Sequence, residues 1–304
     1  MFKLPNGIPT FRDSAQDWAD YAEYNALSAK VNLFELTKSS RMVSDEERIN
    51  GIEDETDKYL QKVDEIATEI HYRMRVGEQF YPFEIGDQDY TINFIQKSNE
   101  ANIIYPYLLF ATRANMSKDR IKAGIDGSLI FEHLCSLVAQ NYFGSRSEVD
   151  ILGTSKEDVS SFRAKLRLIT RVLGEGGEIH ENIGHKPQDD NVDVIVWKSF
   201  KDNQPSKMIA FGQCKTGTSW VDHLSELNTD AFCKTWFTRQ PVLTPLRMFF
   251  TAQYFPRDIF RVRANEAGLV FDRFRILDYL PNNINDSLLN SMDVWTKAIN
   301  NHYS

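Results

Sequence analysis

Long apolar runs and paired cysteines are two features that this 304-residue sequence lacks. No run approaches the roughly 18 to 20 apolar residues that a membrane-spanning helix needs, and residues 1–10 contain no apolar segment of signal-peptide length. The three cysteines are far apart and form neither a C-x-x-C pair nor a zinc-ligand spacing with the histidines. These absences predict a cytoplasmic protein with reduced thiols and no membrane segment.

An excess of positive charge is also absent, because the formal net charge is -8. A generally basic nucleic-acid binder is therefore not expected. The acidity is uneven along the chain. Residues 1–125 contain 15 Lys and Arg against 21 Asp and Glu, a net of -6, whereas residues 126–304 contain 20 against 22, a net of -2. A local basic groove in the second part remains compatible with this distribution.

The remaining composition, 42% hydrophobic and 26% charged, is ordinary for a soluble globular protein of one large or two smaller domains.

We predict a mostly helical accessory or interaction domain over 1–125. A narrow apolar stripe on its long helix fits either packing against the preceding helix or a dimer seam. The predicted elements are a helix over 14–38 with Ser14 as N-cap, a helix over 44–75 with Ser44 and Glu47 as a capping box, a hairpin over 79–95 and a helix over 102–116.

A β-hairpin with a polar end is the strongest local signal in the second part. Residues 192–197 are β-branched and aromatic apart from Asp193, and residues 207–215 follow after a polar turn. Because side chains alternate along a strand, Gln213 and Lys215 share one side and Cys214 faces the other. One carboxylate, one amide oxygen and one amine can therefore converge.

This Asp, hairpin and Gln-x-Lys pattern resembles the core of the PD-(D/E)XK nuclease superfamily. The Gln in place of the usual Glu resembles the Mrr-like restriction endonucleases in particular. A helix that begins Gly-x-x-x-Phe-Glu belongs to the same resemblance, and here Gly127 to Glu132 opens a predicted helix over 128–142. The resemblance implies an α/β restriction-endonuclease-like core over 126–304, with a mixed sheet flanked by helices.

The rest of the second part supplies the core order helix, three strands, helix, strand that the resemblance implies. We expect an inserted helix, which interrupts the compact Mrr-like pattern, and a first strand directly before the loop that leads to Asp193. The predicted elements are the inserted helix over 155–173, the first strand over 176–183, a helix over 219–236, a strand over 247–255, a helix over 257–267, a strand over 269–279 and a helix over 286–301.

The resemblance also implies which residues carry the chemistry. Asp193, the Gln213 side-chain oxygen and the Cys214 backbone carbonyl would hold Mg²⁺ or Mn²⁺, which prefer oxygen ligands. Glu132 would add a second carboxylate, and Lys215 would position the attacking water or stabilise the transition state. The resemblance also includes an additional Asp before Asp193, so Asp189 or Asp190 would assist. The cations of the inserted helix, Arg163, Lys165, Arg167 and Arg171, fit either a solvated helix surface or nucleic-acid contacts, for which Thr216 is a further candidate.

The function expected from this set is hydrolysis of DNA phosphodiester bonds by a metal-dependent endonuclease, as the effector of a prokaryotic antiphage defence or restriction system. Two alternatives stay open: an RNase that uses the same site, and a catalytically silent nuclease fold that serves as a scaffold or binding subunit. Because most of the negative charge lies in residues 1–125, we expect this region to mediate self-association or to dock a helicase or ATPase partner.

Overall fold

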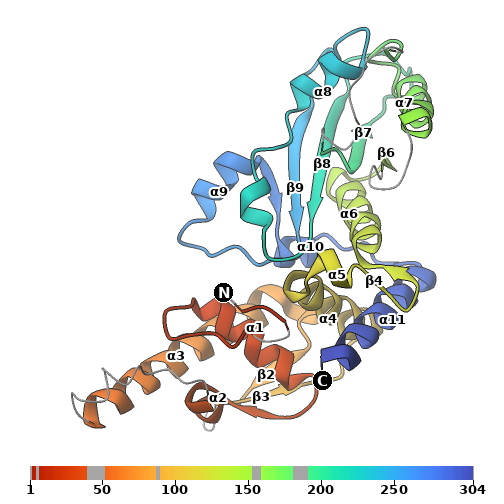
Figure 1. Cartoon of the computed structure of the whole chain (residues 1–304). Helices are drawn as coiled ribbons and strands as arrows, with labels where there is room; N and C mark the ends of the chain where they lie inside the picture. The colour runs from red at the N-terminus through yellow and green to blue at the C-terminus, as the bar shows by residue number, and fades with distance from the viewer. Residues whose placement is uncertain are drawn as a thin grey trace. The chain divides into compact units, whose positions relative to one another are not determined.

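The structure is a computed structural model that describes residues 2–4, 7–39, 52–86, 90–152, 159–180 and 191–303. The chain divides into two units, and the first combines Met1–Ile125 with Leu289–Ser304 (Figure 1). The second unit is the continuous segment Asp126–Leu288. Most of the C-terminal helix, which was predicted to belong to the second part, thus packs with the first. Among the described helices, none has the length and apolar character needed to cross a bilayer.

The first unit is mostly helical with one small antiparallel sheet of strand order β1-β3-β2. Ser14 is the N-cap of the first helix, as predicted, because its hydroxyl accepts a hydrogen bond from the Asp17 N–H. Its elements are α1 (Ala15–Ala26), β1 (Val31–Asn32), α2 (Leu33–Ser39), α3 (Ile52–Gly77), η2 (Glu78–Phe80), β2 (Phe83–Ile85), β3 (Thr91–Phe94), α4 (Asn99–Arg113), α5 (Met116–Asp119) and β4 (Ile121–Lys122), with β5 (Ile125–Asp126) at the boundary.

The helix predicted over 14–38 is two helices separated by a strand. The Asn32 side chain explains the interruption, because its Oδ1 accepts hydrogen bonds from the N–H groups of Phe34 and Glu35 at 3.0 and 3.2 Å and so starts α2. The predicted hairpin over 79–95 is present as β2 and β3. The capping box predicted for the long helix, Ser44 with Glu47, lies outside the described residues.

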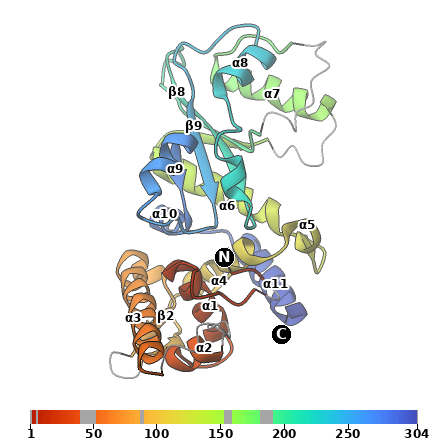
Figure 2. The same cartoon turned by 60° about the vertical axis from the view of Figure 1, so that its left-hand side comes forward.

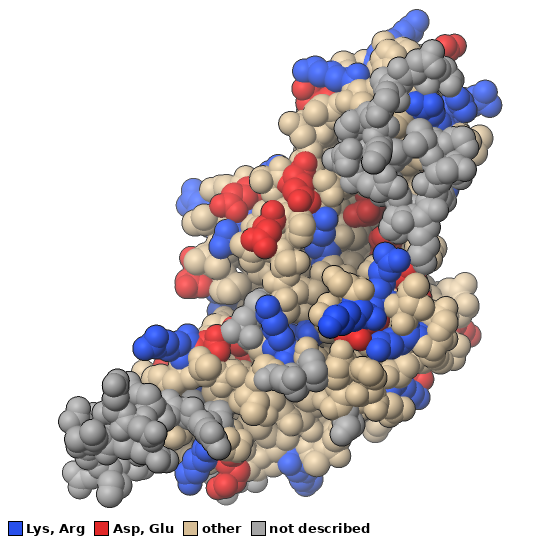
Figure 3. Space-filling view, viewed as in Figure 1, with Lys and Arg blue, Asp and Glu red and all other residues tan. Residues whose placement is uncertain are grey.

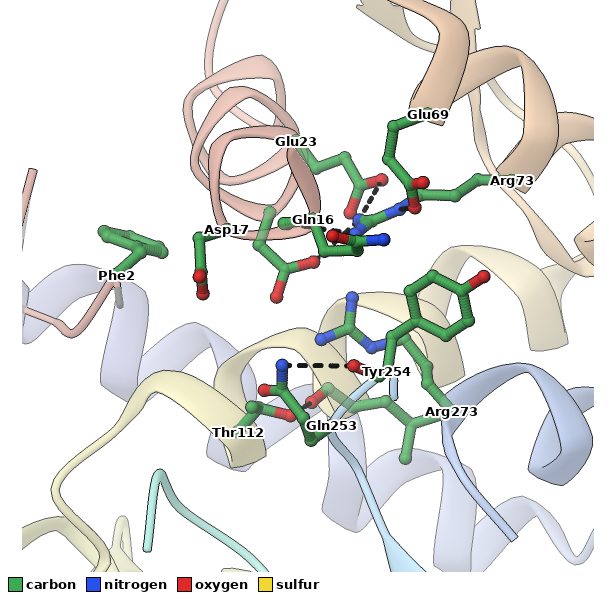
Figure 4. A network of polar contacts seen from close by, with 12 residues as sticks. Phe2, Gln16, Asp17, Glu23, Glu69, Arg73, Thr112, Gln253, Tyr254 and Arg273 are labelled. Carbon is green, nitrogen blue, oxygen red and sulfur yellow. Dashed lines mark hydrogen bonds and ion pairs between the residues drawn. The ribbon is translucent and has the colours of Figure 1, made fainter. Parts of the chain in front are cut away.

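A buried ionic network joins α1, α3 and α4 in the first unit. The Arg73 guanidinium contacts carboxylate oxygens of Asp20, Glu23 and Glu69 at 2.6, 2.8 and 2.9 Å, and all four side chains are at most 1% exposed. Figure 4 shows Glu23 and Glu69 converging on Arg73. Arg113 contacts Asp17 and Asp20 from α4. Buried charges are stable only when they are paired, so this network holds the three helices in one arrangement.

The C-terminal helix α11 (Asp286–Tyr303) completes the core of the first unit. Met292, Trp295 and Ile299 recur at helical spacing and are all fully buried. The indole N–H of Trp295 donates to the Arg120 carbonyl at 3.0 Å, and its ring meets Tyr107 edge-on. A segment distant in sequence thereby fills the centre of the N-terminal unit.

The second unit is built on a five-stranded mixed sheet of order β10-β9-β8-β7-β6. Strands β6, β7 and β8 are antiparallel neighbours, and β8, β9 and β10 are parallel. Its elements are α6 (Gly127–Phe143), β6 (Ser147–Ile151), α7 (Val159–Leu173), β7 (Val194–Lys198), β8 (Met208–Lys215), η4 (Trp220–His223), α8 (Thr229–Trp236), β9 (Leu246–Thr251), α9 (Phe260–Ala267), β10 (Leu269–Phe271) and α10 (Arg273–Asp278). The α/β class with a mixed, helix-flanked sheet is confirmed.

Helices cover both faces of this sheet. Alternate residues of the hairpin, such as Ile195 and Phe211, pack in one cluster with Phe162 of α7 and Trp236 of α8. The rings of Phe162 and Trp236 lie 4.8 Å apart, and Figure 2 shows the two helices side by side. The intervening residues of the hairpin face the other side, where α6 lies against β6, β7 and β8.

Two predicted elements of the second unit differ in the structure, and one strand was not predicted. The strand predicted over 176–183 is not formed by its described residues, 176–180: Ile179 forms one isolated bridge, and Gly176 and Gly177 turn the chain with positive φ. The strand that pairs with β7 is β6, which was not predicted. The helix predicted over 219–236 is η4 followed by α8, because the Asn228 side chain caps a new helix at the Ala231 N–H.

The strand predicted over 269–279 is also shorter than expected. It stops at Phe271, because the Asp272 carboxylate accepts a hydrogen bond from the Arg275 N–H at 3.1 Å and starts α10. The helix predicted over 257–267 begins at Phe260 and ends before Gly268, whose φ of 85° suits a residue without a side chain.

Candidate active site

The β7–β8 hairpin places Asp193 beside Gln213 at one end of the sheet. Val194 pairs with Gly212, and the Asp193 N–H donates to the Gly212 carbonyl at 2.9 Å, so Asp193 lies across from Gln213. The side chain forms a further hydrogen bond, because the Asp193 Oδ2 accepts from the backbone N–H of Cys214 at 2.7 Å. The carboxylate is therefore anchored to the neighbouring strand.

The environment of Asp193 favours the protonated carboxyl group. Burial raises its pKa from 3.8 to about 6, although the Cys214 N–H and the charge of Lys215 both lower it. A carboxylate in this position has lost much of its hydration. It gains most from a nearby positive charge, because that charge replaces the lost solvent.

Gln213 is fully buried, and its two amide ends have different surroundings. Its Nε2 donates to the Glu226 Oε2 at 2.9 Å. Its Oε1 is also buried and has no hydrogen-bond partner among the described residues. An acceptor that is buried without a partner costs on the order of 1–3 kcal/mol, so a group that supplies a partner to this oxygen is strongly favoured there.

Lys215 is held in place by two acceptors. Its Nζ lies 3.3 Å from the Glu226 Oε2 and 3.4 Å from the Asn191 Oδ1. The other oxygen of Glu226 contacts the Nδ1 of His223 at 2.7 Å. Burial opposes ionisation of Glu226, but the contacts with His223, Lys215 and Gln213 outweigh it and lower the pKa of this carboxyl. Glu226 is thus a carboxylate that joins two of the predicted site residues.

Glu132 reaches the same region from the other face of the sheet. The thiols of Cys135 on α6 and Cys214 on β8 share a hydrogen bond. Burial raises the pKa of both thiols, and the charges of Glu132 and Asp193 raise both further. Cys214 therefore faces away from Gln213 and Lys215, as predicted, and its surroundings include both predicted carboxylates.

The oxygen donors around Asp193 fit a hard divalent cation. The Asp193 carboxylate, the Gln213 amide and the backbone of Cys214 lie at one strand end, and the Gln213 Oε1 has no partner among the described residues. Oxygen donors of these kinds are the ligands that Mg²⁺ and Mn²⁺ prefer. Within the described residues, no group of three or more His, Cys, Asp and Glu side chains is arranged to hold a metal ion. The predicted set contains one amide and one backbone oxygen, so it is not a site of that kind.

Four of the five predicted nucleic-acid contacts lie on α7, and the fifth, Thr216, directly follows β8. Phe162, Leu166 and Ile169 of α7 face the core, and the cations of this helix flank that stripe. Arg171 is exposed, whereas Arg163, Lys165 and Arg167 are partly buried. Figure 3 shows Lys and Arg side chains at the surface over α7. Thr216 is half-buried just after β8, and Asp189 and Asp190 lie outside the described residues.

Sequence reasoning missed Glu226, His223 and Asn191. Glu226 is 13 residues from Gln213, and it reaches the site because η4 and the following loop fold back over β8. The signal that could have found it is the pair His223 and Glu226 directly after the Gln-x-Lys strand. A carboxylate and an imidazole three residues apart readily form a contact within one turn.

Comparison of the chain with protein-family models, with curated sequences and with solved structures gave no match. The case for a function therefore depends on the residues of the site and on their geometry.

Proposed function

We propose that this chain is a metal-dependent nuclease of the restriction-endonuclease-like type, which hydrolyses phosphodiester bonds of DNA. The observation that carries the proposal is the meeting of Asp193, Gln213 and Lys215 at one end of β7 and β8, with the Gln213 Oε1 buried and partnerless among the described residues. The order α6, β6, β7, β8, α8, β9 supports it, because this is the core order that the sequence resemblance implies once α7 is treated as an insertion.

Asp193, the Gln213 Oε1 and the Cys214 carbonyl would hold Mg²⁺ or Mn²⁺, with Glu132 as a second carboxylate. When bound, the cation supplies an activated nucleophile and stabilises charge on the phosphoryl group and the leaving oxygen. Lys215 presents an ammonium that Glu226 and Asn191 hold on the same strand end. In this position it orients the attacking water or stabilises the developing negative charge.

The basic residues of α7 provide the proposed contacts to the phosphate backbone. Each phosphate that a Lys or Arg neutralises adds affinity by releasing counterions, so a local group of cations offsets the negative net charge of the chain. These contacts carry no sequence information, which implies binding with little preference for sequence through α7 alone.

A test of the function uses the purified full chain with Mg²⁺ or Mn²⁺ on supercoiled plasmid and, in parallel, on total RNA. We expect plasmid cleavage that a chelator abolishes and that Asp193→Ala and Lys215→Ala each reduce at least about a hundredfold. Lys234→Ala is the matched control, because Lys234 is an exposed lysine of the same unit paired with Asp230. Cleavage of RNA alone would identify an RNase, and equal activity of all variants would contradict the proposal.

A silent scaffold is the second candidate, and one observation favours it. The segment that covers the site is acidic, with Asp222 and Asp230 exposed on either side of Glu226 in the sequence, and Figure 3 shows Asp and Glu gathered over η4. Repulsion from this segment opposes the approach of a phosphate backbone. Absence of any cleavage, together with an undiminished biological activity of the Asp193→Ala and Lys215→Ala variants, would favour the scaffold.

Residues 1–125 are proposed to mediate self-association or docking to a helicase or ATPase that delivers or restrains the nuclease in an antiphage defence system. The acidity of this region, net -6, supports a protein partner over nucleic acid. Sedimentation of the full chain over a range of concentrations tests self-association, and a monomer at every concentration would leave docking as the remaining form of this proposal.

A further inference from the structure

Glu226 occupies a position that neither the sequence pattern nor the proposed ligand set includes. Its Oε2 accepts from the Gln213 Nε2 at 2.9 Å and lies 3.3 Å from the Lys215 Nζ, and its Oε1 contacts the His223 Nδ1 at 2.7 Å. The Glu226 side chain is one-third exposed, whereas Gln213 is fully buried. A surface carboxylate thus fixes the position of a buried amide on the sheet.

An amide side chain has two ends of nearly equal shape and opposite hydrogen-bonding character. Only the oxygen end binds a hard cation, so a Gln at a ligand position is useful only when its orientation is set. A carboxylate accepts hydrogen bonds and cannot donate them when it is ionised, so it selects the NH₂ end of Gln213. The same Glu226 Oε2 also lies 3.3 Å from the Lys215 Nζ, a group that only donates, so this oxygen acts as an acceptor.

We propose that Glu226 is a positioning residue that turns the Gln213 amide so that Oε1 faces the cation site beside Asp193. The inference rests on the proposed function, and it adds the reason why a neutral amide can replace the usual carboxylate in this chain. Partners of metal ligands act in this way in other sites, and their loss typically weakens metal binding by roughly 10- to 100-fold.

The same contact constrains what residue 213 can be. A Glu at this position would place two carboxylates within hydrogen-bond distance of each other, which is unfavourable unless one is protonated. A Glu at 213 with a Gln at 226 reverses the arrangement, because the amide then donates to a carboxylate whose two oxygens are equivalent. In such a pair the carboxylate at position 213 can be turned either way, because both of its ends are oxygens and one of them always faces the cation site.

The test measures Mn²⁺ binding by the full chain directly, by the loss of the free-ion signal in electron paramagnetic resonance. Asp193→Ala comes first, and we expect it to abolish the binding of one ion. Glu226→Gln keeps the size of the side chain but lets either end of Gln213 face the cation site, and we expect Mn²⁺ binding to weaken about tenfold. Asp222→Asn is the matched control, because it also replaces a carboxylate by its amide on the same exposed segment and leaves the contact with Gln213 intact.

The double variant Gln213→Glu/Glu226→Gln is expected to recover the affinity for Mn²⁺ to within about twofold of the original chain or better. Circular dichroism on each variant establishes that the folded state is retained. Binding by Glu226→Gln within twofold of the original chain, or no recovery in the double variant, would overturn the positioning role alone. Binding that Asp193→Ala leaves unchanged would instead overturn the proposed function and this inference with it.

Discussion

The carboxylate of Asp193 and the backbone N–H of Cys214 form a hydrogen bond of 2.7 Å that ties the start of β7 to the end of β8. This bond and the charge of Lys215 offset only part of the cost of burying Asp193, because the pKa of the carboxyl remains raised to about 6. The candidate site therefore contains unfavourable electrostatic energy that a bound cation would relieve.

Asp193→Asn is expected to stabilise the chain at neutral pH when a chelator is present. A raised folded-state pKa means that the folded state binds the proton more tightly than the unfolded state, so this stabilisation is complete below about pH 4 and is lost as the pH rises through about 6. The variant lacks this ionisation. Its free energy of unfolding should match the original chain near pH 4 and exceed it by about 1–3 kcal/mol above pH 6, measured by urea unfolding. A difference that does not vary with pH would contradict the raised pKa.

Arg73→Met is expected to destabilise the first unit by about 3–5 kcal/mol, because it leaves the buried carboxylates of Asp20, Glu23 and Glu69 without their shared cation. Urea unfolding followed by tryptophan fluorescence measures the change. Lys297→Met is the control, since Lys297 is 71% exposed in its ion pair with Asp293 and its removal should leave the midpoint nearly unchanged. Equal effects of the two variants would show that the network contributes little.

Arg167→Ala/Arg171→Ala is expected to weaken binding of a labelled DNA duplex and to reduce the salt dependence of that binding. The slope of log affinity against log salt should become less steep by about 1 for each phosphate contact removed. Fluorescence anisotropy over a series of salt concentrations measures both quantities. The control Arg261→Ala/Lys297→Ala removes two charges from α9 and α11, and the same loss with this pair would indicate only a general charge effect.

Trp295→Ala is expected to cost about 3–5 kcal/mol in the first unit, since the indole is fully buried and donates to the Arg120 carbonyl. The second unit should keep its structure, so Mn²⁺ binding that depends on Asp193 should persist. Limited proteolysis with mass spectrometry locates the loosened segments. Asn290→Ala, at an exposed position of the same helix, should leave the cleavage pattern unchanged. New cleavage confined to 126–288 would show that α11 stabilises the second unit and not the first.

The sequence predicts the centre of the second unit well, because the hairpin and α6 have strong local signals. Strand β6 was missed, since Glu148 and Asp150 interrupt its apolar pattern at the edge of the sheet, where they pair with Trp197 and Ile195. An edge strand tolerates such residues because one side of it faces solvent. The short β10 was overextended because the capping role of Asp272 was not recognised.

The residues of the candidate site also fall into two groups, those that the sequence predicts and those that it does not. Asp193, Gln213 and Lys215 could be found from the sequence because strand alternation and one hairpin bring them together. Glu226 could not be found, because its contact with Gln213 depends on the path of a loop. The sequence predicted one continuous helix over 219–236 where this loop lies. Loop paths are set by tertiary packing, here by Leu224 and Leu227, which enter different core clusters.

The boundary between the two units falls within α11, between Leu288 and Leu289. The second unit, Asp126–Leu288, is therefore an insertion within the first unit and is attached to it by two covalent connections. A protease that cuts one connection produces two fragments, and the fragment that contains the second unit remains covalently joined to one segment of the first. On the ribosome, the complete inserted unit emerges before residues 289–304 supply Trp295 to the first unit. The part of the chain that is translated first is thus the last to acquire its full core, and the unit with the candidate site can fold ahead of it.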